Sequence, residues 1–379
     1  MADPALPSFT WASPTRVVFG TGVLARLPAL LDETAGPGSR AFLVTGRRSL
    51  RESGVLGRVL EALGDRVSLF DGVPPFPPPD HLRAAASAAR AGRPAAVVAI
   101  GGGSALDVGK VVALLLTHDG DPLDYVERRQ PFARAGLPVI AVPTTSGSSS
   151  EVTPFAAFWD LAARRSLHLA SPLLFPRVAL VDPELALGMS PTLAAVTGFD
   201  AFTSAFESYW SVEATPLTDA LNLEVVRLFA EHLERSGRDA DPAARAGCAL
   251  AATLSGLAYS NSRPNVCHAV STPLTLFWGV AHGQAVAVSL PAFLRWTAPL
   301  IGARLPALWR ALGVDDLDGA TRRITAMLER CGLATRLQGL GLAEGDVETL
   351  VEHMRWERVG VLPRPLGRDD ARRILLELI

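Results

Sequence analysis

Two histidines are candidate metal ligands in the stretch from Asn261 to Pro291, NSRPNVCHAVSTPLTLFWGVAHGQAVAVSLP. His268 and His282 lie there among apolar and small residues, where an imidazole needs a polar partner. Asp200, in the upstream segment GFDAFTSAFES, is a possible third ligand on another helix. A carboxylate and two neutral imidazoles can hold a divalent cation and leave one coordination position open, which is the arrangement of a catalytic metal site.

A glycine-rich segment, GGGSALDVGK at residues 101–110, has the composition of a phosphate-binding loop. It follows the apolar run AAVVAI, so its glycines would let the backbone pass close to phosphate at the start of a helix. We expect Ser104 to cap that helix, with Asp107 and Lys110 one turn apart on it. For the glycines alone, a tight strand–helix turn without a ligand is the alternative interpretation.

A second loop, in LPVIAVPTTSGSSSEVTPFA at residues 137–156, repeats this design with hydroxyl groups. Uncharged hydroxyl side chains suit phosphate or ribose, although they are also common in ordinary turns. Ligands of open α/β sheets lie at the carboxyl ends of strands, so two such loops after neighbouring strands favour a nucleotide site. The hydroxyl residues of this loop are Thr144, Thr145, Ser148, Ser149 and Ser150.

The elements that must position these residues are of two kinds. Short apolar runs such as TRVVFG, RAFLVTG and AAVVAI alternate with helical patterns in the first half, which predicts an α/β domain with a parallel sheet. From about residue 190 helical spacing dominates, and we expect no alternating strand after VALVDPEL at 178–185. The 379 residues therefore predict two domains, an α/β dinucleotide-binding domain at 1–187 and an all-α metal-binding domain at 188–379.

Composition argues against other classes of protein. A net charge of −2 without a basic block gives no electrostatic support for binding nucleic acid. The three isolated cysteines favour a reduced, cytoplasmic setting over a disulfide framework. The longest apolar runs, such as VVALLL, are far too short to span a membrane, and the first residues lack the pattern of a signal peptide.

Five segments in order resemble consecutive signatures of the iron-containing (group III metal-dependent) alcohol dehydrogenases: GGGSALDVGK, PTTSGSSSEVTPFA, VALVDPEL, TGFDAFTSAFESY and HAVSTPLTLFWGVAHG. The resemblance runs from FGTG near the start to LPRPLGRDDARRIL near the end. It implies a dehydroquinate synthase-like fold, with a Rossmann-like N-terminal domain, a helical C-terminal domain and an active site in the cleft between them. It also implies a homodimer or larger assembly.

The resemblance assigns roles to individual residues. Asp200, His268 and His282 match three of the family's four ligands for Fe²⁺ or Zn²⁺. The residues implied to line the cofactor are Gly102, Gly103 and Ser104 at the pyrophosphate, Asp107 near the nicotinamide, Thr144, Thr145, Ser148 and Thr153 in the second loop, and Arg165 in place of the family's usual lysine.

The chain departs from the family pattern at three places. Ser204 stands where the fourth ligand, a histidine, is usual, and Thr272 replaces another active-site histidine. Ser148 and Ser149 replace a usual Thr-Gly pair. Two functional interpretations remain: three ligands hold the cation, or the metal is lost and the histidines act as donors or proton carriers. A third alternative is that His268 and His282 are only core histidines with satisfied hydrogen bonds. We favour the first, because an uncompensated Asp200 among helices would be costly to bury.

Gly46 and Arg47, at the end of the strand RAFLVTG, bear on the choice of cofactor. An acidic residue at this position would bind the ribose 2′-hydroxyl and repel a 2′-phosphate. Its absence, together with the adjacent Arg47 and Arg48, favours NADPH over NADH. A solvated pair of arginines on a loop is the alternative.

The expected activity is reduction of a small aldehyde to an alcohol, by hydride transfer next to a metal that polarises the carbonyl. The segment NSRPNVCHAVSTPLT resembles the phosphonoacetaldehyde reductase branch of the family, which makes 2-hydroxyethylphosphonate. Arg263 could bind an anionic substrate group or form a structural ion pair. Bound water, the Thr272 hydroxyl or the cofactor ribose could donate the proton. A dehydroquinate synthase-like lyase and a non-catalytic nucleotide-binding relative are the alternative functions.

Overall fold

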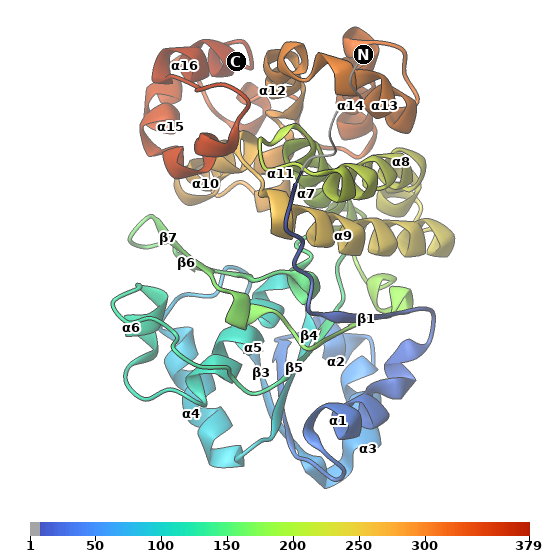
Figure 1. Cartoon of the computed structure of the whole chain (residues 1–379), viewed down its shortest axis with the longest axis vertical. Coiled ribbons are helices and arrows are strands. Elements are labelled where there is room, and N and C mark those ends of the chain that lie inside the picture. The colour runs from blue at the N-terminus through green and yellow to red at the C-terminus, as the bar shows by residue number, and fades with distance from the viewer. Residues whose placement is uncertain (1–7) are drawn as a thin grey trace.

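The computed structural model describes residues 8–379 and divides them into a sheet domain and a helical domain (Figure 1). The first domain contains a six-stranded sheet in the order β1-β8-β5-β4-β2-β3, in which all neighbouring strands run parallel. These strands are β1 (Arg16–Phe19), β2 (Ala41–Gly46), β3 (Val67–Val73), β4 (Ala96–Gly101), β5 (Val139–Pro143) and β8 (Val178–Val181). The predicted parallel α/β domain is therefore confirmed.

Helices cover both faces of this sheet, because its central strands are apolar on both sides. Successive residues of β4 point to opposite faces of the sheet and pack into two different hydrophobic cores. Val98 packs with α1 and α3 on one face, and Val97 packs with α4 and α5 on the other. The helices of this domain are α1 (Leu27–Ala35), α2 (Ser49–Glu52), α3 (Val55–Leu63), α4 (His81–Gly92), α5 (Gly103–Leu115) and α6 (Pro122–Val126).

A two-stranded antiparallel hairpin, β6 (Phe155–Asp160) and β7 (Arg165–Ala170), extends from this domain toward the helices. The sequence analysis did not predict this hairpin, because β6 (FAAFWD) shows no alternation and β7 (RSLHLA) alternates over only four residues. No strand follows β8 within residues 8–379, as predicted. The predicted domain boundary at 187/188 falls between β8 and the first long helix.

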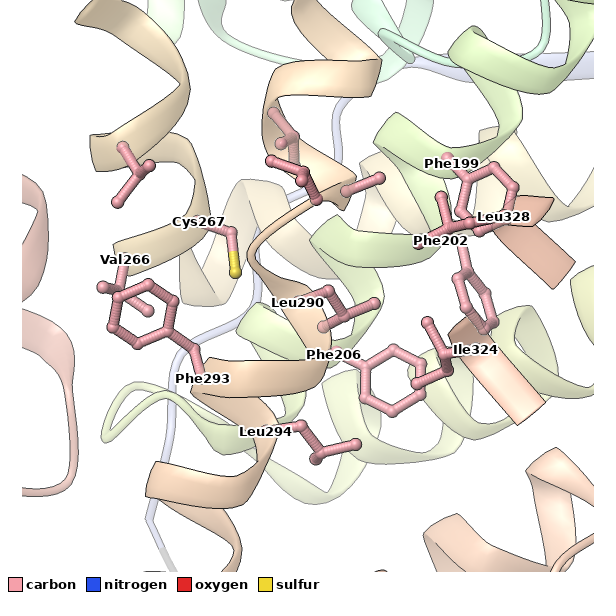
Figure 2. Close-up of a cluster of buried hydrophobic side chains, with 14 of the residues drawn as sticks. Phe199, Phe202, Phe206, Val266, Cys267, Leu290, Phe293, Leu294, Ile324 and Leu328 are labelled. Carbon is pink, nitrogen blue, oxygen red and sulfur yellow. The ribbon is translucent and has the colours of Figure 1, made fainter. Parts of the chain in front are cut away.

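The second domain is helical and is built around α7. Phe199, Phe202 and Phe206 recur at helical spacing on α7 and are fully buried (Figure 2). Its helices are α7 (Pro191–Trp210), α8 (Pro216–Arg238), α9 (Pro242–Ser262), α10 (Val266–Trp278), α11 (His282–Ala287), α12 (Leu290–Thr297), α13 (Leu305–Leu312), α14 (Leu317–Arg330), α15 (Val347–His353) and α16 (Arg368–Leu376).

The three longest helices of this domain begin at the same local signal, a capping side chain followed by proline. Ser190, Thr215 and Asp241 cap α7, α8 and α9, and each accepts a hydrogen bond from a backbone N–H group of the first turn. Within the described part of the chain, no single helix is long and apolar enough to span a membrane.

Candidate active site

The start of α10 is tied to α7 by Asn265, and this fixes the position of His268. The Asn265 side chain accepts hydrogen bonds from Trp210 Nε1 (2.8 Å) and from the Val266 N–H group (2.9 Å). Its amide donates to the carbonyl oxygen of Glu207 (2.9 Å). His268 is the third residue of α10, so the Asn265 cap that ties the start of this helix to α7 also places His268 beside α7.

His282 is brought to α7 by a close helix contact that requires glycine. It is the first residue of α11, and Gly283 follows it. A Cβ atom on Gly283 would lie 1.9 Å from the carbonyl oxygen of Val196 on α7, which is sterically impossible. Glycine therefore lets α11 approach α7 closely enough for His282 to face Asp200.

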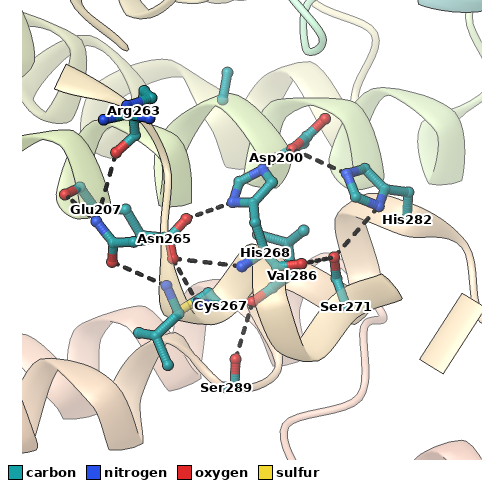
Figure 3. Close-up of polar contacts among 12 residues, drawn as sticks. Asp200, Glu207, Arg263, Asn265, Cys267, His268, Ser271, His282, Val286 and Ser289 are labelled. Carbon is teal, nitrogen blue, oxygen red and sulfur yellow. Dashed lines mark hydrogen bonds and ion pairs between the residues drawn. The ribbon is translucent and has the colours of Figure 1, made fainter. Parts of the chain in front are cut away.

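Asp200, His268 and His282 come together as the sequence predicted (Figure 3). Asp200 Oδ1 is 3.3 Å from His268 Nε2 and 4.0 Å from His282 Nε2, and the three ligand atoms all lie within 4.8 Å of one another. Metal–ligand bonds of about 2.0–2.2 Å in a tetrahedron place ligand atoms roughly 3.4 Å apart. The donor set therefore fits a single divalent cation.

Glu207 sets the tautomer of His268 that a cation needs. A carboxylate accepts hydrogen bonds only, so His268 Nδ1 donates to Glu207 Oε2, and the ring's other nitrogen, Nε2, faces Asp200. The second carboxylate oxygen accepts from the backbone N–H groups of Cys267 and His268. Glu207 is fully buried, and its place behind a ligating histidine is that of an orienting carboxylate. Its role was not predicted from the sequence.

The balance between burial and nearby charge differs for the pKa values of the two histidines. Burial opposes protonation of His268, but the charge of Glu207 and the hydrogen bond to Asp200 outweigh it and raise its pKa to about 9. Burial lowers the pKa of His282 to about 4. Burial also opposes ionisation of Asp200, yet its contacts with His268 and the charge of His282 lower its pKa. The Asp200 carboxylate and the neutral His282 imidazole are thus available as ligands at neutral pH, and a bound cation would take the place of the proton on His268.

The glycine loop after β4 leads directly into α5, and this corrects one prediction. The helix cap is Gly102, with no capping side chain, and α5 begins at Gly103. Ser104 therefore lies inside the first turn and does not cap the helix. A Cβ atom on Gly103 would lie 2.5 Å from Ser148 Oγ, so glycine is required where the two loops meet. The unpaired N–H groups at this helix start suit a phosphate.

Asp107 and Lys110 hold the second loop against α5. The Asp107 carboxylate accepts hydrogen bonds from the Ser150 hydroxyl and from the Ala157 N–H group (2.9 Å). Buried Lys110 lies 3.4 Å from Asp107 and donates to backbone carbonyls of the loop, including that of Thr153 (3.3 Å). Asp107 is therefore engaged with the protein's own loop while it lines the cleft.

Both loops and the metal-ligand candidates line one cleft of about 1280 Å³ between the domains. This volume exceeds the ~300–1,000 Å³ of ordinary small-molecule pockets and suits a dinucleotide together with a small substrate. The predicted site residues that line it are Gly46, Arg47, Gly102, Gly103, Ser104, Asp107, Thr144, Thr145, Ser148, Thr153, Asp200, Arg263, His268, Thr272 and His282.

Two predicted arginines make other contacts. Arg165, on the β6–β7 hairpin, does not line this cleft; it pairs with Asp160 (3.2 Å) and Glu127 (3.1 Å), which accounts for its charge without a cofactor. Arg263 lines the cleft, but its guanidinium donates to both carboxylate oxygens of Glu213. For Arg263 the structure therefore has the ion pair rather than a free anion-binding group.

The two substituted positions face the same cleft as the ligands. Ser204, one turn after Asp200 on α7, is buried and lines the cleft. Thr272 also lines it, and its hydroxyl donates to the carbonyl oxygen of His268 (3.4 Å). A serine hydroxyl adds little to a cation site, so the chain itself supplies three strong ligands and leaves open positions.

The sequence analysis missed two cleft residues, Arg355 and Arg358. Arg358 lies on the 3₁₀ helix Trp356–Val361, and Arg355 is the residue just before that helix. No periodic pattern or family motif marked them. Their closest sequence signal is the density of arginine in MRWERVG, which equally fits an exposed turn.

Comparison with known proteins identifies the family. Residues 14–183 match the iron-containing alcohol dehydrogenases, and residues 194–378 match the C-terminal domain of the Fe-containing alcohol dehydrogenase family. The chain belongs to the iron-containing alcohol dehydrogenase family. It is thus an NAD(P)-dependent oxidoreductase acting on CH–OH groups, and Asp200, His268 and His282 form the divalent-metal site typical of that family. The lyase and the non-catalytic alternatives are accordingly set aside.

Individual relatives span the whole chain. The long-chain-alcohol dehydrogenase 1 of Geobacillus thermodenitrificans is 32% identical over 365 residues, 92% of each chain. The phosphonoacetaldehyde reductase of Streptomyces viridochromogenes is 33% identical over 396 residues, 96% of each chain. The crystal structure of sulfoacetaldehyde reductase from Bifidobacterium kashiwanohense with NAD⁺ superposes with a TM-score of 0.92, at 28% identity and over 98% of this chain and 99% of that one.

Sequence identity does not single out one branch of this iron-containing alcohol dehydrogenase family. A choline dehydrogenase, a 1,3-propanediol dehydrogenase and lactaldehyde reductases are 29–33% identical to the chain, close to the value for the phosphonoacetaldehyde reductase. The predicted membership of the phosphonoacetaldehyde branch is therefore not distinguished from these alternatives by identity, and the substrate must be argued from the site.

Proposed function

We propose that this alcohol dehydrogenase reduces a small anionic aldehyde with NADPH, and that phosphonoacetaldehyde, giving 2-hydroxyethylphosphonate, is the substrate that fits best. The observation that carries the proposal is the set of Asp200, His268 and His282, which faces a nucleotide-binding loop across one cleft. Two relatives are named for aldehydes with an anionic head group, a phosphonate in one and a sulfonate in the other. Arg355 and Arg358, which line the same cleft as the ligand set, also favour an anionic aldehyde.

Each part of the cleft has a role in this reaction. The N–H groups at the start of α5, beside Gly102 and Gly103, would bind the pyrophosphate. Asp200, His268 and His282 would hold Fe²⁺ or Zn²⁺. That cation would supply Lewis-acid polarisation of the aldehyde carbonyl, and the reduced nicotinamide would supply the hydride. Glu207 accepts the hydrogen bond from Nδ1 and so orients the His268 ring with Nε2 as the nitrogen that would bind the cation.

Other residues would line the cofactor and shape the step that completes the alcohol. Thr144, Thr145, Ser148 and Thr153 offer hydroxyl and backbone groups along the cleft. The alcohol oxygen also needs a proton. Thr272 cannot replace a histidine as an acid of suitable pKa, so a water molecule or a ribose hydroxyl beside it is the better source.

The preference for NADPH rests on the end of β2. Gly46 ends the strand and offers no carboxylate to a ribose 2′-hydroxyl. Arg47 is fixed there by a hydrogen bond from Nε to the carbonyl oxygen of Gly72 (3.1 Å), and Arg48 adjoins it on the cleft wall. Two guanidinium groups at this place favour a 2′-phosphate.

The test is an NADPH-oxidation assay with purified protein loaded with Fe²⁺ or Zn²⁺. Phosphonoacetaldehyde, sulfoacetaldehyde, propanal and lactaldehyde are compared at equal concentration. The proposal predicts stoichiometric formation of NADP⁺ and alcohol, with kcat/KM at least tenfold higher for the two anions. A higher kcat/KM for propanal would overturn the substrate class. Light scattering on the same sample measures the oligomeric state, for which a homodimer is expected.

A further inference from the structure

Arg355 and Arg358, which line the cleft, each have a buried guanidinium nitrogen without a protein partner. Among residues 8–379, the Arg358 side chain forms no hydrogen bond or ion pair, and its buried Nε atom has no partner. Arg355 donates through Nε to Glu357 (2.6 Å), but its buried Nη1 atom also has no partner. Buried donors without acceptors are costly, so the arrangement is consistent with a ligand that supplies them.

The pair is fixed next to the metal-ligand set by the backbone. The N–H group of Arg355 donates to the carbonyl oxygen of Ala269 (3.2 Å), the residue after His268. Arg355 and Arg358 therefore lie on the side of the cleft that holds the metal-ligand residues.

The surrounding charges leave this region positive. Asp200 and Glu207 both belong to the ligand set, where a bound divalent cation would balance their charges. Glu357 is exposed and balances one guanidinium at most. Burial and the charges of Arg355 and Arg358 hold His168, across the cleft, neutral by lowering its pKa well below its usual value. One positive charge thus remains for an anion.

We propose that Arg355 and Arg358 bind the tetrahedral oxyanion head group, a phosphonate or sulfonate, of the aldehyde whose carbonyl faces Asp200, His268 and His282. Arginine presents several N–H donors in a planar fork and matches such oxygens well. The proposal rests on the proposed function and deepens it, because it assigns the selectivity for an anionic substrate to Arg355 and Arg358 instead of Arg263. Arg263 is less suited, because its side chain is 57% exposed and is paired with Glu213, whereas the Arg355 side chain is 19% exposed and Arg358 has a buried donor without a protein partner.

The test uses ligand binding and turnover together. Calorimetric titration measures the affinity for ethylphosphonate and for ethanesulfonate, with NADP⁺ and Zn²⁺ present. The variants are Arg358→Met and Arg355→Met, which keep length but remove charge, and Arg263→Met is the matched control. Turnover of propanal, which has no head group, is measured for each protein.

Either cleft variant should weaken ethylphosphonate binding by about 10- to 100-fold, as expected for loss of a charge-assisted contact. The Arg263→Met control should stay within about threefold, and propanal turnover should stay within about threefold in all three variants. The wild-type affinities for the two probes then tell which head group the site prefers. If Arg358→Met is unfolded by circular dichroism, Arg355→Met carries the test.

Three outcomes would overturn the inference. They are no binding of either probe to the wild type, unchanged binding in both cleft variants, and a loss of propanal turnover that parallels the loss of binding. The last would mean that the arginines support the metal site. If the cleft variants lose ethylphosphonate binding but the wild type reduces no aldehyde, the proposed function is refuted and the anion-binding site is still supported.

Discussion

Replacing Glu207 by glutamine should weaken the metal site without removing a ligand. The substitution keeps the size of a fully buried side chain. Its carbonyl oxygen can still accept from the backbone N–H groups of Cys267 and His268, which leaves the amide NH₂ group facing His268 Nδ1. Two donors cannot face each other, so His268 would carry its proton on Nε2, the atom that faces Asp200.

The expected size of the effect follows from the loss of that orientation. Removing a carboxylate behind a ligating histidine typically costs 10- to 100-fold in metal affinity. We expect the same here, which corresponds to about 1.4–2.8 kcal/mol. The affinity for Zn²⁺ is measured at pH 7.5 by competition with a chromophoric chelator, and thermal melting without metal reports on folding.

Glu213→Gln is the matched control, because Glu213 is a carboxylate that pairs with Arg263 and has no contact with the ligand set. The control should bind Zn²⁺ within twofold of the wild type. Equal Zn²⁺ affinity of Glu207→Gln and wild type, with both folded, would refute the idea that Glu207 fixes the His268 tautomer.

Three further substitutions give separate expectations. Ser204→His adds a ligand one turn after Asp200 and should slow loss of Zn²⁺ to a chelator at least tenfold; unchanged loss would place residue 204 outside the coordination sphere. Arg48→Ala should raise the KM for NADPH about tenfold and leave that for NADH within twofold, as initial rates would show; equal changes would argue against 2′-phosphate recognition. Burial raises the pKa of Glu151 from 4.5 to about 7, so the folded state holds the Glu151 proton more tightly than the unfolded chain does. The resulting stabilisation of the folded state is complete below pH 4.5 and is lost as the pH rises through 7. Between pH 5 and 8 the free energy of unfolding, measured with urea, should fall by up to about 3 kcal/mol less in Glu151→Gln than in the wild type. Parallel dependences of the unfolding free energy on pH in the two proteins would contradict the raised pKa.

The parts of the site that sequence predicted are those with local signals. Strands that end in glycine, and a helix that starts after them, place Gly102 and Gly103 at the sheet's carboxyl edge whatever the rest of the fold does. Asp200, His268 and His282 were predicted because their chemistry is distinctive in apolar helices. Ser104 was wrongly expected to cap α5, because the exact first residue of a helix depends on backbone angles that glycine leaves open.

The parts that were missed depend on contacts between distant segments. Glu207 lies two turns after Asp200, but only the packing of α10 on α7 shows that it faces His268. Arg165 was assigned to the cofactor by resemblance, yet the hairpin that carries it supplies Asp160 as a partner. Arg355 is brought to the cleft by a turn that follows α15 and contacts Ala269, more than 80 residues earlier in the chain.

The central claim is that one divalent cation, held by Asp200, His268 and His282, is required for aldehyde reduction. The most direct measurement is the metal content per chain, taken on the same samples as NADPH oxidation, for the wild type and His268→Ala. We predict about one Fe²⁺ or Zn²⁺ per wild-type chain, with both metal and turnover lost in the variant and turnover lost from the wild type after chelation. Full turnover by wild-type protein that contains no metal would contradict the account.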